Sequence, residues 1–377
     1  MSKFIARKAR ISRLFIFPVR FSREVAFYNN VFFWYNDLMK TLKEFKYWLR
    51  GREFLGVEYP IISGAMTWIS DSKLVKAVSD AGGLGVLAGG NMPGEFLAQE
   101  IKTLKDQKVN YAVNLITIAP NYREHLKVVT RLEVPMVFFA GSFPRKEEVK
   151  AAKDSGARAI CFASTDSIAD RMIDYGADAL VLEGSEAGGH IGHVSTIVLI
   201  QQVLFHFPDI PIFVAGGIAT GKMIAHLFLM GAAGVQMGTI FAMSEESSAH
   251  PRFKERFKKA RAREAFATPQ YDSSLPVVAV RAIKNKGTED FGKLQLDLLE
   301  RVKHHEISQL QAQYQVEKYW AGALRRAVQE GDIEHGSLMA GQSVGLVHDI
   351  KSIRQIIAGL LTEADREIQS VRDLLHL

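Results

Sequence analysis

The sequence predicts an α/β protein, a closed (β/α)8 TIM barrel followed by a C-terminal helical appendage. The first reason is a recurring unit in which a helix ends at a glycine and a short apolar run follows, as in residues 79–89, 154–163, 174–184 and 229–239. Glycine suits the left-handed position just after a helix. The second reason is that these runs do not alternate with polar residues, which is typical of strands buried on both faces in a parallel sheet. The third is their number, because eight strand–helix units close a barrel.

The units follow one another over about 200 residues. The expected strands are 58–62, 83–88, 111–116, 135–139, 158–163, 179–183, 211–215 and 234–238. The expected helices are 72–80, 95–104, 121–130, 146–154, 166–175, 197–207, 220–230 and 249–262. A doubly wound open sheet would use the same units, but eight of nearly equal length favour the barrel.

Three regions are expected along the chain. Residues 1–50 form a basic, aromatic N-terminal extension, and residues 51–262 form the barrel. Residues 263–377 are loop-rich at first and then helical, with a terminal helix at 350–375. We expect this last region to pack as an appendage that covers one end of the barrel.

The composition is that of a soluble globular protein, because 47% of the 377 residues are apolar and 23% are charged. The single cysteine, Cys161, excludes an intramolecular disulfide and a cysteine-ligated zinc or iron–sulfur site. It also favours a reducing compartment, so we expect a cytoplasmic location. The net charge is +6, and seven basic residues without an acid lie within residues 1–23, which leaves −1 for the rest. A nucleic-acid partner is therefore not expected.

The basic, aromatic residues 1–38 allow two interpretations. They are either an upstream stretch translated from an early start codon, with Met39 as the working start, or a targeting or membrane-touching segment. No transmembrane helix is expected. The apolar stretch 225–243 is better explained by a helix that ends at Gly231 and a buried strand from Val235.

Chemistry is expected where the strands end, because TIM barrels carry their sites at the C-terminal ends of the strands. His190 lies seven residues beyond the end of the sixth strand, between Gly189 and Gly192. An imidazole there can hold, give or take a proton near neutral pH, so His190 is the catalytic candidate. The nearby His193 is its competitor.

Glycines follow the next two strands. Gly216 and Gly217 come after the seventh strand, and Gly238 and Thr239 come after the eighth. Barrels often bind a phosphate at this place through backbone N–H groups. Ordinary turn chemistry is the alternative.

Two further positions are candidates for a flat ligand. Gly64, Ala65 and Met66 follow the first strand, where small residues would let a ring lie on the backbone. Met66 could equally fill the core. Asn114 is a polar residue in a site-facing place on the third strand, and an Asn turn or cap is its alternative.

At these residues the sequence resembles the nitronate monooxygenase (2-nitropropane dioxygenase) family of FMN-dependent barrels, and within it the enoyl-acyl carrier protein reductase II branch. The resemblance covers about residues 54–365. It rests on PIISGAMTWISD (60–71), AGGLGVLAGGNMP (81–93), NLITIAP (114–120), EGSEAGGHIG (183–192), FVAGGIATG (213–221), GAAGVQMGT (231–239), SSAHP (247–251), VRAIKN (280–285) and GSLMAGQ (336–342). Glu183, VRAIKN and GSLMAGQ favour the reductase branch.

The resemblance implies FMN, with its phosphate on the 216–217 and 238–239 loops and its isoalloxazine against Gly64, Ala65, Met66 and Asn114. It implies cofactor-side positions for Glu183, Gly188, Gly189 and Gln236, and it makes His190 the catalytic-site histidine. NADH or NADPH is the implied co-substrate, no metal is implied, and a homodimer is what the family suggests.

Three functions are expected in this order. The first is NAD(P)H-dependent reduction of enoyl-acyl carrier protein thioesters in fatty acid synthesis. The second is a nitronate monooxygenase that oxidises alkyl nitronates with O2. The third is a non-catalytic FMN-binding or membrane-tethered scaffold, which residues 1–38 would attach to a membrane. The expected partner is a small-molecule or acyl-carrier-protein-bound substrate.

Overall fold

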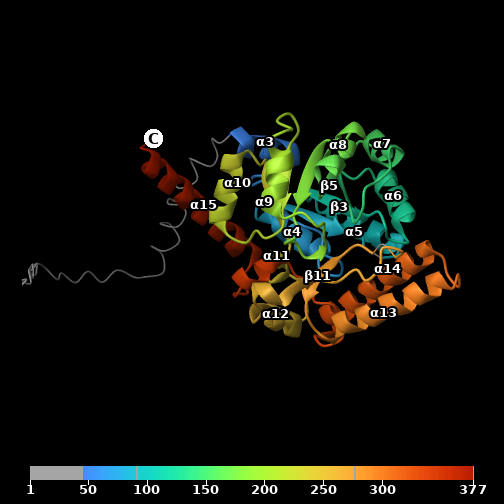
Figure 1. Ribbon diagram of the computed structural model, residues 1–377. Helices are drawn as coiled ribbons and strands as arrows, with labels where there is room; N and C mark the ends of the chain where they lie inside the picture. Colours follow the sequence, from blue (N-terminus) through green and yellow to red (C-terminus); the bar gives the residue numbers. More distant parts are fainter. Residues whose placement is uncertain (1–45, 91, 276, 377) are drawn as a thin grey trace, which may run out of the picture.

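A computed structural model describes residues 46–90, 92–275 and 277–376 and confirms the closed eight-stranded parallel barrel (Figure 1). The expectations for residues 1–38 lie outside the described residues. The barrel strands are β1 (Ile61–Ser63), β2 (Leu84–Ala88), β3 (Tyr111–Ile116), β4 (Met136–Ala140), β5 (Arg158–Ala163), β6 (Ala179–Glu183), β8 (Ile212–Ala215) and β9 (Gly234–Met237). Pairing of β1 with β9, with Ile62 opposite Gln236, closes the barrel.

Seven helical segments follow the strands in the expected order. They are α4 (Ser72–Asp80), α5 (Gly94–Asp106), α6 (Tyr122–Arg131), α7 (Lys146–Asp154), α8 (Asp166–Asp174), α9 (Thr196–Leu199), which a π-helical turn η1 (Ile200–Leu204) continues, and α10 (Gly221–Met230). Gly82, Gly156, Gly176 and Gly231 all have φ between 88° and 106°. Because an L side chain disfavours that conformation, these glycines explain where each helix stops.

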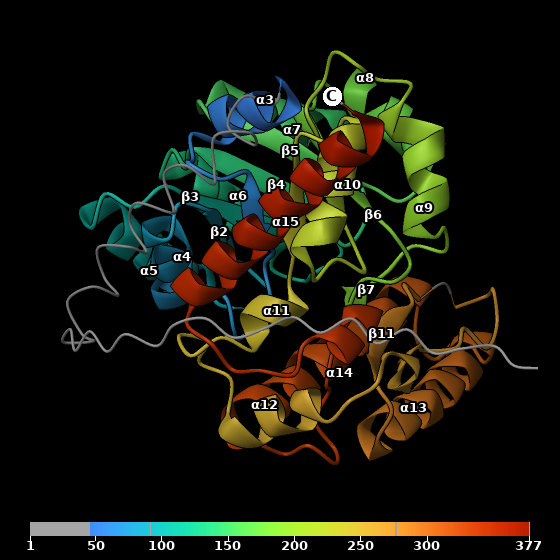
Figure 2. The same ribbon diagram turned by 90° about the vertical axis from the view of Figure 1, so that its left-hand side faces the viewer.

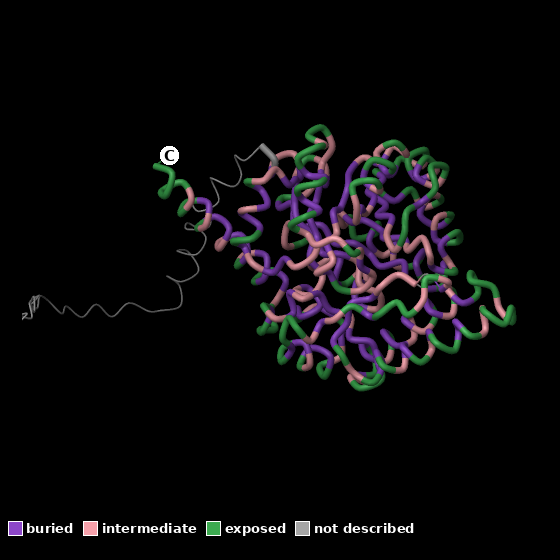
Figure 3. The backbone as a smooth tube through the Cα atoms, viewed as in Figure 1, coloured by how far each residue is buried: buried purple, intermediate pink, exposed green. Residues whose placement is uncertain are grey.

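The core has two layers, as expected for strands that are buried on both faces. Ile62, Val86, Phe138, Val181 and Phe213 fill the interior of the barrel, and their side chains are fully or almost fully buried. A second apolar layer lies between the strands and the surrounding helices. Figure 3 shows this buried centre under an exposed helical surface.

Two expected boundaries at the start of the barrel are wrong. The first strand begins at Ile61 rather than at residue 58, and Pro60, which has no N–H to donate, directly precedes it. The boundary between residues 50 and 51 falls inside helix α3 (Lys46–Leu55), whose Trp48 is fully buried and packs against Phe228. Helix α3 is therefore part of the barrel's packing.

The structure also differs from the expectation at the eighth helix of the barrel wall. We expected helix 249–262 there, but α12 (Pro251–Lys258) lies at the end of the barrel, on the same side as α13 (Lys286–Lys303) and α14 (Gln309–Arg325) (Figure 2). The C-terminal helix α15 (Ile353–Leu375) packs along α10 and also contacts α4. The expected division at residues 262 and 263 thus does not hold, because α15 belongs to the barrel. Helix α15 can pack there because one of its faces is apolar along its length, with Ile353, Ile357, Leu361 and Ile368 buried.

Close contact between α10 and α15 depends on a residue without a side chain. The backbone N–H of Gly221 donates to Glu363 Oε2 at 2.8 Å. A Cβ at Gly221 would overlap the carbonyl oxygen of Leu360 and lie 2.6 Å from the backbone nitrogen of Ala364.

We therefore expect Gly221→Ala to lower the free energy of unfolding by about 1–3 kcal/mol, the usual cost of overpacking. Gly359→Ala is the matched control, because it lies on α15 and a Cβ there meets nothing within 4 Å. Alanine in that helix should be neutral or stabilise the protein by up to about 1 kcal/mol. Thermal and urea unfolding of both variants tests this, and equal stabilities would contradict the close packing.

The remaining segment, residues 265–347, lies over the C-terminal ends of the strands and is called the lid here. It contains β10 (Ala265–Ala267), β11 (Val280–Ile283), α13 (Lys286–Lys303), α14 (Gln309–Arg325), the π-helical turn η3 (Arg326–Glu330) and the 3-10 turn η4 (Gln342–Leu346). Helices α13 and α14 pack antiparallel around Phe291 and Trp320 (Figure 1). No helix among the described residues is long and apolar enough to cross a membrane.

Candidate functional site

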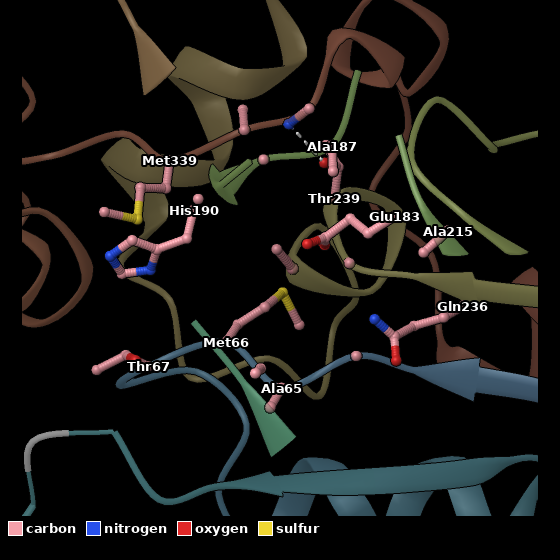
Figure 4. A pocket seen from close by; sticks show the side chains of 18 of the residues that line it. Ala65, Met66, Thr67, Glu183, Ala187, His190, Ala215, Gln236, Thr239 and Met339 are labelled. Atoms are coloured by element: carbon pink, nitrogen blue, oxygen red, sulfur yellow. Dashed lines mark hydrogen bonds between the residues drawn. The ribbon is translucent and has the colours of Figure 1, made fainter. Parts of the chain in front are cut away.

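A pocket opens between the C-terminal ends of the strands and the lid (Figure 4). The centre of a water-sized sphere can move through about 200 Å³ of this pocket, and ~10–15 Å³ of the same kind of volume is enough to hold one water molecule. It can therefore take a much larger ligand. All the site residues expected from the sequence line it: Gly64, Ala65, Met66, Asn114, Glu183, Gly188, Gly189, His190, Gly216, Gly217, Gln236, Gly238 and Thr239. The competing His193 is exposed and does not line it.

The backbone of His190 is held by the lid. Gly189 and His190 form a short strand, β7, that pairs antiparallel with β11, so that Val280 lies opposite His190. The next residue, Ile191, donates its N–H to the carbonyl oxygen of Ala279 at 2.9 Å. A three-stranded sheet of β10, β11 and β7 thus fixes the catalytic candidate.

The His190 imidazole contacts a carboxylate from the lid. Its Nε2 lies 3.1 Å from Oε1 of Glu317 on α14, and Glu317 is only 5% exposed. Burial lowers the pKa of His190, but the Glu317 carboxylate and, to a smaller extent, Glu183 raise it, and the net shift is upward. Because Nε2 faces Glu317, Nδ1 is the ring nitrogen left for a ligand.

Glu183 ends β6 and points into the pocket near Met66 (Figure 4). Burial raises its pKa to about 8, although the nearby His190 works in the opposite direction. The carboxyl group is therefore mainly protonated at pH 7, where it can donate a hydrogen bond.

The raised pKa of Glu183 predicts that the free energy of unfolding depends on pH. The folded protein holds this proton up to about pH 8, whereas an ordinary glutamate loses it near pH 4.5. The contribution of Glu183 to stability is thus complete below about pH 4.5 and is lost as the pH rises toward 8. We expect Glu183→Gln to become more stable relative to the unsubstituted protein across this range. Urea unfolding of the flavin-free proteins at pH 5 and pH 8 measures it, and a pH-independent difference would contradict the buried, protonated carboxyl.

The two glycine loops form one side of the pocket. Gly216 and Gly217 have φ values of 96° and 75°, which only glycine adopts without strain. Gly238 follows the neighbouring strand β9 and precedes the short helix α11 (Thr239–Ala242). The lid closes on these loops, because Gly341 donates its N–H to Thr239 Oγ1 at 3.1 Å.

The residues that follow β1 lie beside the loop at Gly238, because β1 pairs with β9. In Figure 4, Ala65, Met66 and Gln236 lie below Glu183 and His190. The backbone of Gly64 is so close to Gln236 that a Cβ would lie 3.0 Å from its Nε2. Asn114 lies within β3 and is 7% exposed. Polar side chains of Asn114 and Gln236 therefore line the pocket beside the residues that follow β1.

The lid residues of the pocket were not among the candidates that the sequence patterns indicated. These are Glu317, Trp320, Ala321 and Leu324 from α14 and Met339, Ala340, Gly341 and Ser343 from the loop before and within η4. One signal was present in the sequence. An acidic residue falls on a helix face that also carries Trp320 and Leu324, three and seven residues later, and such spacing puts it on the apolar side.

A strained residue also joins the barrel to the lid. Trp68, in the loop after β1, has a φ of 68°, which is unusual for a bulky side chain. Its Nε1 donates to the carbonyl oxygen of Ala321 on α14 at 3.0 Å. Helix α14 is thus attached to the barrel at two places, through Trp68 and through His190.

The closed parallel barrel and the pocket at its C-terminal end define a TIM-barrel enzyme. The family model for nitronate monooxygenase matches residues 50–109 and 105–363, and the chain belongs to that family. It is an oxidoreductase of a family whose members are flavin enzymes.

Several known proteins are similar to the chain. FabK from Thermotoga maritima is 35% identical with a TM-score of 0.74, and the match covers 86% of this chain and 98% of FabK. The (3aS,4S,5R,7aS)-5-hydroxy-7a-methyl-1-oxo-octahydro-1H-indene-4-carboxyl-CoA dehydrogenase of Mycobacterium tuberculosis is 27% identical over 86% of this chain and 98% of the relative. A probable nitronate monooxygenase of Staphylococcus aureus is 26% identical over 78% of this chain and 92% of the relative.

Proposed function

We propose that the chain binds FMN in this pocket and uses NADH or NADPH to reduce the carbon–carbon double bond of enoyl thioesters. The observation that carries the proposal is the His190–Glu317 pair, because it favours a protonated imidazole that can donate a proton inside the pocket. The 35% identity to FabK, a member of the enoyl-acyl carrier protein reductase II branch, supports the same reaction. The indene-carboxyl-CoA dehydrogenase supports a thioester substrate, since its name contains an acyl-CoA.

The residues of the pocket fit FMN. Gly64 packs so closely against the side chain of Gln236 that a Cβ would press on it, and the flat ring would lie along Gly64, Ala65 and Met66. Gly216, Gly217, Gly238 and Thr239 would hold the phosphate through backbone N–H groups. Asn114, Glu183, Gly188, Gly189 and Gln236 would complete the polar contacts.

FMN supplies hydride transfer, here from the nicotinamide to the β-carbon of the enoyl group. His190 would give its proton to the α-carbon, so that the double bond gains one hydride and one proton while NAD(P)H is oxidised. The lid would exclude water, and Glu317 would hold the imidazolium until the proton leaves. An acyl carrier protein or coenzyme A carries the thioester in this proposal. The homodimer that the resemblance implies and the cytoplasmic location expected from the single cysteine stay predictions.

The second candidate is a nitronate monooxygenase, favoured by the Staphylococcus aureus relative. There the histidine would deprotonate or orient the nitro compound. A raised pKa leaves less of the neutral imidazole that could act as a base near pH 7, which ranks this function second.

An anaerobic absorbance titration distinguishes the two. We expect NADH or NADPH to bleach the flavin of the purified protein, and crotonyl or a longer enoyl thioester to restore its colour. A flavin that ignores both nicotinamides and bleaches with an alkyl nitronate would establish the monooxygenase. If neither the nicotinamides nor the nitronate reduces the flavin, the non-catalytic FMN-binding scaffold is the remaining function. A protein that cannot be reconstituted with FMN would refute the assigned cofactor.

A further inference from the structure

We infer that Glu317 is the positioning residue of His190, so that the proton donor is complete only when helix α14 of the lid is docked on the barrel. The activity arm of the test rests on the proposed reductase function, whereas the spectroscopic arm does not.

The contact joins two parts of the structure that are far apart in sequence. His190 belongs to the loop after β6, and Glu317 belongs to the middle of α14. The Nε2–Oε1 distance is 3.1 Å, and the two side chains are 19% and 7% exposed. Glu317 comes from the same face of α14 as Trp320 and Leu324, which also line the pocket. The carboxylate thus reaches His190 only through the position of the whole helix.

Two carboxyl groups act on the imidazole, Glu317 from α14 and Glu183 from β6. Their effects on the imidazole differ in size. Glu183, with a pKa of about 8, is mainly neutral at pH 7, and its effect on His190 is the smaller one. Glu317 is therefore the counter-ion that favours the imidazolium, and it fixes the ring by occupying Nε2.

The chain offers a matched control for lid docking. The Trp68 Nε1–Ala321 hydrogen bond also ties α14 to the barrel, but it is uncharged and does not involve His190. Trp68→Phe removes this N–H donor and keeps an aromatic ring. It therefore removes one uncharged contact of the same helix, while the His190–Glu317 pair and the packing of α14 against α13 stay in place.

The test is to measure the pKa of His190 by NMR in the holoenzyme, with its signal assigned by its loss in His190→Gln. In Glu317→Gln the pKa should fall by about one unit, as for loss of an opposite charge at this distance. Glu317→Asp, which keeps the charge on a shorter side chain, should recover part of the shift. Trp68→Phe should leave the pKa unchanged.

The pH profile of enoyl thioester reduction gives the second readout. A lower pKa means that Glu317→Gln loses the imidazolium at lower pH. At a pH above the His190 pKa of both enzymes, kcat of Glu317→Gln should be about tenfold lower than that of the unsubstituted enzyme. At pH 6 the difference in kcat should be much smaller. Any loss in Trp68→Phe should be independent of pH.

An unchanged His190 pKa in Glu317→Gln would overturn the inference, and so would an equal pKa shift in Trp68→Phe. If Glu317→Gln does not fold, Glu317→Asp provides the test. A His190 pKa in Glu317→Asp equal to that in the unsubstituted protein would overturn the inference, and a lower one would support it. If neither thioesters nor nitronates react, the proposed function fails while the pKa values still test the pair.

Discussion

Replacement of His190 by alanine should lower kcat for enoyl thioester reduction by about 10²–10⁴-fold, the usual contribution of a positioned general acid. The side chain lines the pocket and contacts Glu317 of the lid, whereas the phosphate is assigned to other loops, so FMN should remain bound and the flavin spectrum should be retained. Steady-state rates with NADH and crotonyl thioester measure the loss. NADH should still bleach the flavin anaerobically, because no proton from His190 is needed for that half-reaction.

His193→Ala is the control, since this side chain is exposed and lies outside the pocket. It should react at the unsubstituted rate. Turnover of His190→Ala at that same rate with every substrate would show that the proton comes from elsewhere, and an equal loss in both variants would indicate damage to the loop rather than to chemistry.

Gly216→Ala should weaken FMN binding by about tenfold or more. The residue has a φ of 96°, and a Cβ would lie 3.0 Å from the carbonyl oxygen of Gly184. Left-handed backbone costs an L residue roughly 1–2 kcal/mol, and relief of that strain would move the loop that is assigned to the phosphate. Because 1.4 kcal/mol equals a factor of ten in affinity, the effect is measurable by flavin fluorescence titration.

Gly156→Ala is the matched control for strain alone. Its φ is 91°, and a Cβ there meets nothing within 4 Å. The variant should lose a similar amount of stability and bind FMN as tightly as the unsubstituted protein. Equal affinities in the two variants would argue against a phosphate site at Gly216.

Local signals in the sequence were enough to predict the barrel. Each glycine that ends a helix and each uninterrupted apolar run reflects a short-range rule; the glycine recurs in four units and the apolar run in all eight. The site residues at strand ends were found for the same reason, because His190, Gly216 and Gly238 all follow buried strands. The structure brings them together in one pocket.

Contacts between distant segments could not be predicted in this way. Pairing of β7 with β11 needs register information that a two-residue strand does not carry. The spacing of Glu317 with Trp320 and Leu324 indicates a buried side chain, but its partner His190 is known only once the fold places α14 over the pocket. The position of α15 is a similar case, since two helices were available for one place in the wall, and only packing decides between them.

Because α15 comes late in the sequence but packs beside the barrel, the barrel wall is completed only after the lid has been synthesised. Strand β9, which closes the barrel, ends at Met237, but the helix that covers the neighbouring wall begins only at Ile353, after the whole lid has been made. During translation the nascent barrel therefore exposes the surface of α10 around Gly221, which α15 covers, until residues 353–375 leave the ribosome. The native contacts between α10 and α15 span a long stretch of chain, which slows folding.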